Sequence, residues 1–265
     1  MRLLIHRNYD EVCRWTAGYI AGRIVTYKPS AEKPFVLGLP TGSSPLGVYR
    51  ELIKKNHGEG LSFKHIITFN MDEYDGLPAD HPQSYARFMK DNFFSQIDIL
   101  PQNTHIPNGM ANNKAAECAA YEESIKNAGG IELFLGGMGN NGHIAFNEPG
   151  SSFASRTREH TLSQDTRIAN ARFFGGDIEK VPSTAMTVGI GTVMDSREVV
   201  IIVSGAQKAA ALAAAVEGAV SAWCPLSCLQ MHSNAVLVCD EDAAGELRFS
   251  TVKYFREMER GNLYQ

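Results

Sequence analysis

Short apolar runs alternate with longer, helix-like segments along almost the whole chain. Glycine, proline or polar residues bound these runs, as they bound buried strands. Strands that alternate with helices predict an α/β fold, in which a mostly parallel sheet is covered by helices on both faces. The predicted strands cover residues 3–5, 35–39, 65–69, 131–135, 199–203 and 235–239. The predicted helices lie near residues 8–26, 45–56, 84–95, 114–128, 206–217 and 251–260.

No linker, repeat or low-complexity segment interrupts this order. The 265 residues therefore predict a single domain that spans residues 1–265. Residues 150–185 are polar, rich in Ser and Arg, and show no clear period. We expect this stretch to form a mobile, lid-like excursion from the domain.

Composition excludes several classes of protein. A net charge of −4 argues against a nucleic-acid surface. The N-terminus holds only a three-residue apolar stretch, too short for a signal peptide or a membrane span, so we expect a cytoplasmic protein without a membrane partner. The five cysteines stand at scattered positions that fit neither a disulfide framework nor a zinc site, which predicts reduced thiols and no metal.

The glycine-rich stretch GGMGNNGHIAFNEPGSS at residues 136–152 follows a predicted strand. Ligands of open α/β sheets bind beyond the carboxyl ends of the strands, so this loop is a candidate site. Its glycines allow the backbone to approach a ligand closely. A purely structural turn would need the glycines but not the imidazole of His143 and the carboxylate of Glu148.

Two further strand-to-helix turns have the pattern of anion sites. LGLPTGSSP at residues 37–45 opens a helix with a Gly/Ser/Thr turn but lacks the nucleotide and dinucleotide patterns, which favours a small phosphate ester. The alternative is a well-capped helix, with Pro45 in its first turn and Ser43 or Ser44 as the cap. SGAQKAAAL at residues 204–212 places Lys208 near a helix N-terminus, where a cation is unfavourable unless it serves a bound anion. Arg172 is a second candidate cation.

The stretch ITFNMDEYDGLP at residues 67–78 carries a pair of acidic residues just past a predicted strand. A partly desolvated carboxylate there titrates nearer neutrality and suits acid/base chemistry. We expect only one of Asp72 and Glu73 to face a pocket. The alternative is a solvated acidic turn.

Taken together, these stretches resemble the glucosamine-6-phosphate deaminase family. The resemblance runs from residue 1 to about residue 254 and rests on FVLGLPTGSSP, FNMDEY, HPQSY, GHIAFNEPGSS, SRTR, ANARFF, AMTVGIGT and SGAQKA. It implies a doubly wound α/β fold, a homohexamer, and neither a redox nor a metal cofactor. It also implies an enzyme of amino-sugar catabolism that converts glucosamine 6-phosphate to fructose 6-phosphate and ammonia.

The resemblance also implies residue roles. His143 would open the sugar ring, Glu148 would orient it, and Asp72 would carry a proton from C2 to C1. Because the carbonyl and amine of the substrate delocalise charge, neither a metal nor pyridoxal phosphate is needed. The phosphate would be anchored by Thr41, Gly42, Ser43, Arg172 and Lys208.

The chain departs from the family pattern at two places. Asn141 stands where the family has an aspartate, so we expect His143 to be a weaker base and Asn141→Asp to raise turnover. The positions that match an allosteric site for N-acetylglucosamine 6-phosphate are Ser151, Arg158, His160, Thr161 and Tyr254. His160 replaces a lysine there, and Glu159 adds a negative charge beside it, so we expect weak effector binding.

Two other functions compete with deamination. A 6-phosphogluconolactonase-like hydrolase shares the architecture and a sugar-phosphate site, but has no use for a base at Asp72. A non-enzymatic sugar-phosphate sensor would keep the phosphate turns without needing Asp72 and His143 together. Such sensors usually carry a DNA-binding helix-turn-helix, for which this chain has neither spare length nor a basic surface.

Overall fold

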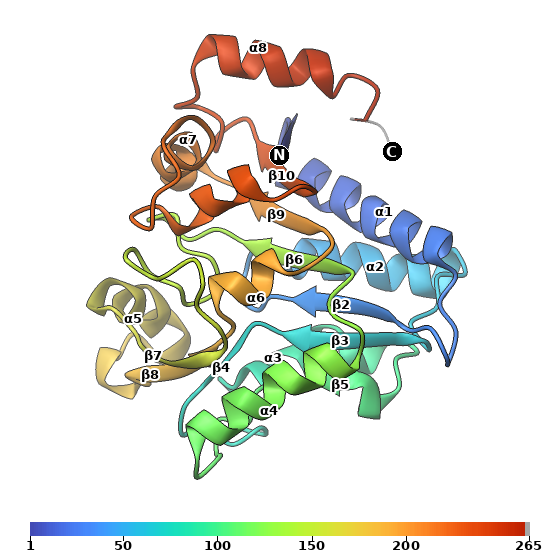
Figure 1. The fold of residues 1–265 in the computed structure, drawn as a ribbon, viewed down its shortest axis with the longest axis vertical. Helices are drawn as coiled ribbons and strands as arrows, with labels where there is room; N and C mark the ends of the chain where they lie inside the picture. The colour runs from blue at the N-terminus through green and yellow to red at the C-terminus, as the bar shows by residue number, and fades with distance from the viewer. Residues whose placement is uncertain (263–265) are drawn as a thin grey trace.

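The computed structural model describes residues 1–262. A seven-stranded sheet runs through the centre of the molecule (Figure 1), and all its paired strands are parallel. In spatial order its strands are β1 (Arg2–His6), β10 (Ala235–Asp240), β9 (Val199–Val203), β6 (Leu133–Gly137), β2 (Phe35–Leu39), β3 (Ile66–Asn70) and β5 (Thr104–His105). Six of these strands coincide with predicted ones to within two residues. The two-residue β5 was missed, because it is too short to show a pattern.

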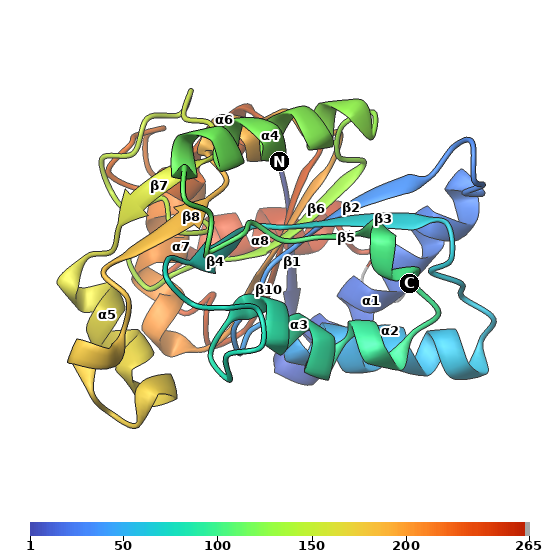
Figure 2. The same cartoon turned by 90° about the horizontal axis from the view of Figure 1, so that it is seen from below.

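Each face of this sheet packs against its own group of helices. Along β9, Val199, Ile201 and Val203 belong to one buried cluster, whereas Val200 and Ile202 belong to the other. Figure 2 shows α4 and α6 on one side of the sheet and α1, α2 and α3 on the other. The prediction of a doubly wound sheet is therefore confirmed. The helices are α1 (Tyr9–Tyr27), α2 (Leu46–Gly58), α3 (Tyr85–Asn92), α4 (Lys114–Asn127), α6 (Ile190–Met194), α7 (Ala209–Glu217) and α8 (Phe249–Met258).

A second, antiparallel sheet lies beside the first. It consists of β4 (Asp72–Tyr74), β8 (Thr184–Thr187) and β7 (Arg158–Thr161), and α5 (Gln164–Ala171) follows β7. Tyr74, Phe146, Leu162 and Phe174 form part of a small core beneath it. The excursion at residues 150–185 thus has regular structure that the sequence pattern did not reveal, since its elements are short and mostly polar. Its mobility stays a prediction.

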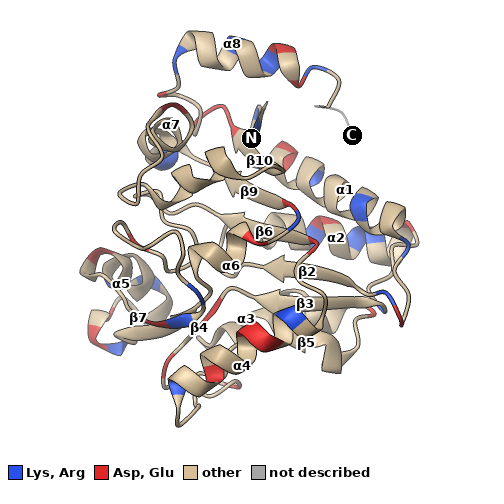
Figure 3. Cartoon of the chain, viewed as in Figure 1, with Lys and Arg blue, Asp and Glu red and all other residues tan. Residues whose placement is uncertain are grey.

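Charged residues lie on the helices and loops, whereas the strands of the large sheet are almost free of them (Figure 3). Both α1 and α2 carry Lys or Arg as well as Asp or Glu, so neither helix presents charges of a single sign. None of the helices within residues 1–262 combines the length and the apolar character that crossing a membrane requires. All five cysteines are free thiols.

Candidate active site

The large sheet has a topological switch point between its neighbours β2 and β6. From β2 the chain proceeds outward to β3 and β5, then returns to β6 and continues through β9 and β10 toward β1. The carboxyl ends of β2 and β6 are therefore adjacent, and the chain continues from them toward opposite edges of the sheet. Ligands of open α/β sheets bind in the crevice at such a point. The turns that follow β2 and β6 are ones that the sequence singled out.

The two predicted phosphate turns meet at this edge. The Lys208 Nζ atom lies 3.5 Å from the Ser44 Oγ atom, which joins the turn after β9 to the turn after β2. Lys208 ends the 3-10 turn η5 (Ala206–Lys208) and directly precedes α7. Burial lowers the pKa of the Lys208 ammonium group, with a further contribution from Arg172 that the Asp240 carboxylate opposes. A partly buried cation next to Ser44 is suited to holding a phosphate.

Arg172, the other predicted phosphate ligand, begins the 3-10 turn η3 (Arg172–Phe174) at the end of α5. Its guanidinium group is exposed and lies 4.7 Å from the centre of the Phe173 ring. The charge of Arg172 contributes to the lowered pKa of Lys208, so the two positive charges act on each other.

Tyr9 holds the turn after β2, a role that the sequence gave no sign of. Its hydroxyl donates to the Ser44 carbonyl oxygen at 2.8 Å and accepts from the Gly47 N–H at 2.9 Å. The predicted cap by Ser43 or Ser44 was wrong: α2 begins after Pro45 without a side-chain cap. The hydroxyl of Tyr9, on α1, satisfies an N–H of the first turn instead, which leaves the two serine side chains available to a ligand.

Asp72 lies on β4 as a buried carboxylate with only 6% of its surface exposed. Its Oδ1 atom is buried without a hydrogen-bond partner. Burial and, to a smaller extent, the nearby Glu73 raise the pKa of Asp72 to about 8, against the opposing effect of a hydrogen bond with Thr41. A carboxyl that titrates near neutrality and has one oxygen unused is poised to act as a general base. Thr41, expected on the phosphate, contacts this base.

Glu73, the other member of the acidic pair, serves the backbone. Its carboxylate accepts from the N–H groups of Tyr74, Tyr85 and Ala86 at 2.9, 2.9 and 2.8 Å. Two of these donors belong to the first turn of α3, so Glu73 caps that helix. Of the pair, only Asp72 is therefore left for chemistry. The sequence predicted that one of the two, but not both, would face a pocket.

The loop after β6 folds tightly around His143. The Gly139 N–H donates to the His143 carbonyl oxygen at 2.9 Å. A Cβ atom at position 139 would lie 2.1 Å from the imidazole ring, so only glycine fits there. The ring is thus packed directly on its own loop.

Asn141 connects His143 to Glu148. Its Oδ1 atom accepts from the His143 backbone N–H at 3.2 Å and lies 2.7 Å from the His143 Nδ1 atom. Its Nδ2 atom donates to the Glu148 Oε2 atom at 2.9 Å. Because a backbone N–H can only donate, Oδ1 must face the histidine, and Nδ1 must carry the proton. The Nε2 atom of His143 is then the acceptor of the neutral ring.

Electrostatics keep this histidine neutral. Burial lowers the pKa of His143, Glu148 opposes that effect, and Lys208 lowers the pKa further. A neutral imidazole whose Nε2 atom accepts a proton is a base that can return the proton as an acid.

Glu148 is held from the opposite side by the excursion. Its Oε1 atom accepts hydrogen bonds from the hydroxyls of Ser163, at 3.0 Å, and Thr166. Burial alone would raise the pKa of Glu148, but the hydrogen bonds from Thr166, Asn141 and Ser163 and the charge of His143 bring it below the usual value. Glu148 is therefore an anion at neutral pH. The sequence gave no sign of Ser163 or Thr166.

The histidine loop packs against the strand pair that carries Asp72. Thr187 on β8 is the register partner of Asp72 on β4. The hydroxyl of Thr187 accepts from the Phe146 N–H at 3.1 Å. Asp72 and the loop that contains His143 thus share a neighbour, and one site brings together the predicted base, the predicted imidazole and the phosphate turns.

Asp240, at the carboxyl end of β10, organises the turn before Lys208. It accepts from the Ser204 hydroxyl and, at 3.1 Å, from the Gly205 N–H. Its charge also opposes the lowering of the pKa of Lys208. An aspartate at a strand end was a signal that sequence reasoning had available and did not use.

The residues predicted for an effector site are brought together only in part. The Arg158 guanidinium group donates to Asn147 at 2.8 Å and lies 3.5 Å from the Ser151 hydroxyl. His160 and Thr161 follow on β7, and the Nε2 atom of His160 is buried without a partner. Tyr254 lies on α8, which runs along the opposite end of the molecule from β7 (Figure 1). One copy of the chain therefore does not bring Tyr254 to Arg158.

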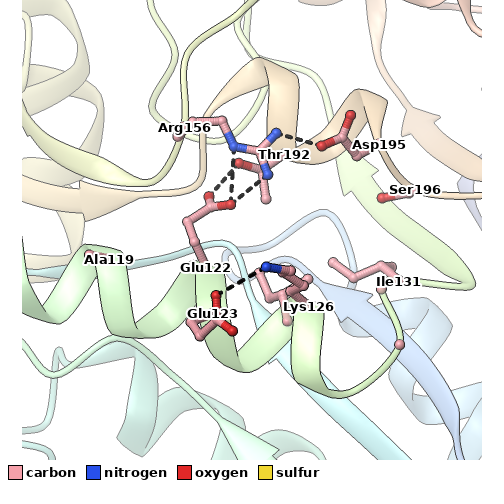
Figure 4. A pocket seen from close by; sticks show the side chains of 12 residues that line it. Ala119, Glu122, Glu123, Lys126, Ile131, Arg156, Thr192, Asp195 and Ser196 are labelled. Carbon is pink, nitrogen blue, oxygen red and sulfur yellow. Dashed lines mark hydrogen bonds and ion pairs between the residues drawn. The ribbon is translucent and has the colours of Figure 1, made fainter.

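A cavity of about 650 Å³ lies away from this site. Residues 129–131 and Ser196, which line it, precede β6 and β9, so it opens at the amino edge of the large sheet. Figure 4 shows its polar wall, where Glu122 on α4 accepts from Arg156 at 2.6 Å and from Thr192 at 2.6 Å. Its charged groups are paired with one another, and this network ties α4 to α6.

Comparison with known proteins agrees with this geometry. The model of the family described as "Glucosamine-6-phosphate isomerases/6-phosphogluconolactonase" matches residues 7–238. The glucosamine-6-phosphate deaminase of Treponema denticola is 59% identical over 264 residues, which cover 99% of this chain and 97% of the relative. The protein of the same name from Pectobacterium atrosepticum is 56% identical over 259 residues, which cover 98% and 97%.

Solved structures show the same fold. A monomeric glucosamine-6-phosphate deaminase superimposes with a TM-score of 0.86 and 43% identity, over 94% of this chain and 100% of that one. The 6-phosphogluconolactonase of Trypanosoma cruzi gives a TM-score of 0.72 with 18% identity, over 93% and 96%, and so shares the fold.

Proposed function

The chain belongs to the family of glucosamine-6-phosphate isomerases and 6-phosphogluconolactonases, and we propose that it is a glucosamine-6-phosphate deaminase. The reaction converts glucosamine 6-phosphate and water to fructose 6-phosphate and ammonia, as a step of amino-sugar catabolism. It combines an aldose–ketose isomerisation with the hydrolysis of an imine.

One observation separates this activity from that of the lactonases in the family. Asp72 is a buried carboxylate with a pKa of about 8 and an oxygen without a hydrogen-bond partner. Hydrolysis of a lactone removes no proton from carbon. Deamination does, because the proton on C2 must move to C1. A desolvated base beside the phosphate turns therefore favours the deaminase.

Ring opening comes first and uses His143. The Nε2 atom of the neutral imidazole takes the proton of the C1 hydroxyl and returns it to the ring oxygen as the C1–O5 bond breaks. The transient imidazolium is stabilised by Glu148, whose Oε2 atom lies 3.8 Å from Nδ1. Asn141 keeps the Nδ1 proton in place throughout.

Isomerisation follows on the open aldehyde. Asp72 removes the C2 proton to give an enolamine and delivers a proton to C1, which leaves an imine at C2. Water adds to this imine and ammonia departs. The carbonyl and amine of the substrate delocalise the developing charge, so the residues need neither a metal nor a cofactor to carry these steps.

The phosphate stays intact and orients the sugar. Its ligands would be the turn of Thr41, Gly42 and Ser43 together with Arg172 and Lys208. The assignment is supported by the contact of the partly buried Lys208 with Ser44, in the turn that opens α2. Fixing the phosphate lowers the entropic cost of bringing C2 to Asp72.

We also propose a homohexamer in the cytoplasm, with N-acetylglucosamine 6-phosphate as a weak effector. Support for self-association comes from exposed apolar side chains, since Phe249 and Trp223 are 84% and 78% exposed. One solved relative is described as monomeric. Sedimentation equilibrium of the purified protein distinguishes the two: a mass six times that of the chain supports the proposal, and a single-chain mass refutes it.

The activity is tested by ammonia release from the purified wild-type protein. Glucosamine 6-phosphate should release ammonia and form fructose 6-phosphate in equal amounts, whereas glucosamine without the phosphate should react poorly. Hydrolysis of 6-phosphogluconolactone well above the spontaneous rate, with no ammonia from the amino sugar, would replace the proposal by a lactonase.

A further inference from the structure

Two hydroxyl groups on α5 hold the Glu148 carboxylate. Ser163, the N-cap of α5, and Thr166, in its first turn, both donate to the Oε1 atom. Both donors come from the excursion between β7 and β8, which is separate from the loop that carries Glu148 itself (Figure 1). The carboxylate is thus oriented by an element outside the catalytic loop.

The other oxygen of Glu148 continues a chain of hydrogen bonds to the imidazole. Its Oε2 atom accepts from the Asn141 amide at 2.9 Å, and the Oδ1 atom of that amide lies 2.7 Å from the His143 Nδ1 atom. If the carboxylate rotated, the amide nitrogen would lose the one side-chain acceptor that it contacts within residues 1–262. The proton on Nδ1 would then lose its fixed partner.

We infer that Thr166, assisted by Ser163, is a positioning residue that acts through Glu148 and Asn141 to hold His143 with its proton on Nδ1. Neither hydroxyl needs to touch the substrate. The inference rests on the proposed deamination, in which the free Nε2 atom opens the ring. It adds α5 to that site, because the hydroxyls of α5 then help to fix the tautomer of His143.

A purely structural role for these hydroxyls predicts different behaviour. Ser163 also accepts from the Thr166 N–H at 3.2 Å, as an N-cap does, so its loss weakens α5 in any case. Thr166→Val keeps the shape of the side chain and leaves that cap in place. It removes the donor to Glu148, together with the 3.1 Å contact between the Ser163 and Thr166 hydroxyls. Thr166→Ser retains the hydroxyl, and Gln164→Ala alters an exposed residue of the same helix as a matched control.

The first measurement is the pH dependence of deamination between pH 6 and pH 9. The titratable groups around the chain of hydrogen bonds are His143, His160 on β7, and Lys208 before α7. Thr166→Val should lower kcat about 10-fold, as expected for a hydrogen bond to a charged group, leave KM within twofold, and change the pH profile of kcat. Thr166→Ser should recover most of the loss, and Gln164→Ala should match the wild type.

The second measurement reads the imidazole directly. Two-bond ¹⁵N–¹H correlation spectra distinguish the two neutral tautomers, and a His143→Gln spectrum assigns the signal. His143 should carry its proton on Nδ1 in the wild type and become a mixture of tautomers in Thr166→Val. This measurement needs no substrate, so it tests the positioning role even if the protein proves not to be a deaminase.

The outcomes separate cleanly. Unchanged kcat, pH profile and tautomer in Thr166→Val would overturn the inference while the deaminase assignment stands. A loss of kcat with a lowered Tm, an unchanged tautomer and no recovery in Thr166→Ser would also overturn it, in favour of a structural cap. A wild-type protein that releases no ammonia would refute the proposed function, and the tautomer measurement would still decide the positioning role.

Discussion

At the scale of single residues, Asn141 is the most consequential departure from the family pattern, because it replaces an aspartate in the loop that carries His143. The amide presents an oxygen to His143 and a nitrogen to Glu148. An aspartate can supply only the first of these contacts. Sequence reasoning, which considered only the contact to His143, expected Asn141→Asp to raise turnover, and the second contact reverses that expectation.

Asn141→Asp would place two carboxylate oxygens about 2.9 Å apart, at the distance that now separates the Asn141 Nδ2 and Glu148 Oε2 atoms. Like charges at this range raise the pKa of one partner. We expect kcat to fall below the wild-type value above pH 8, where both groups ionise, and to recover toward pH 6 as the pair shares a proton. A kcat above that of the wild type throughout pH 6–9 would contradict this account.

Lys208 supplies a second prediction at this scale. Lys208→Ala should raise KM for glucosamine 6-phosphate by roughly 10- to 100-fold, the range expected when one hydrogen bond to a charged group is lost, and change kcat much less. Lys180→Ala, which removes an exposed lysine paired with Asp177, is the matched control. Equal KM values for the two variants would place the phosphate elsewhere.

At the scale of elements, β7 carries Arg158 and His160 of the proposed effector site. Burial lowers the pKa of His160 on this strand, the charge of Arg158 lowers it further, and Glu148 opposes both. His160 is therefore neutral at pH 8 and gains its charge only below its usual pKa of 6.5. Arg158 alone then has to attract a phosphate.

The ratio of activities with and without N-acetylglucosamine 6-phosphate should consequently be close to one at pH 8 and grow as the pH falls toward 6. His160→Lys should give activation already at pH 8, and His160→Ala should give none at either pH. Strong activation of the wild type at pH 8 would show that the neutral imidazole suffices.

The same scale shows what a sequence can and cannot reveal. Six of the seven strands of the large sheet were predictable because each contains an apolar run that is buried, whereas β5 is too short to show one. The strands β4, β7 and β8 were not, because they are short and carry charged residues such as Asp72 and Arg158. Asp72, His143 and Lys208 could be predicted because each follows a predicted strand within a few residues or in the turn after it, and the turns of His143 and Lys208 contain glycine. Tyr9 and Thr166 act through contacts between distant segments, which no local pattern encodes.

At the scale of the whole molecule, the buried base imposes a pH-dependent loss of stability. The pKa of Asp72 is raised from 3.8 to about 8 in the folded protein. Between these values the folded state keeps a proton that the unfolded state releases, so the stability that the neutral group contributes is full below 3.8 and disappears as the pH rises through about 8. The molecule bears this cost in order to keep a base within an apolar site.

Asp72→Asn stays neutral at every pH and avoids this cost. Its Tm should therefore exceed that of the wild type by a margin that widens from pH 5 to pH 8 and then levels off. Thermal unfolding of both proteins in matched buffers provides the measurement. A margin independent of pH would mean that Asp72 ionises in the folded protein as easily as in the unfolded chain.

The central claim is that Asp72 moves the proton from C2 to C1, and the most direct test is the rate of ammonia formation by Asp72→Asn at pH 8. General-base catalysis contributes roughly 10²- to 10⁴-fold, so the account predicts a loss of kcat in that range while KM changes little. Retention of more than about a third of the wild-type rate would contradict it, since a neutral amide cannot accept the C2 proton.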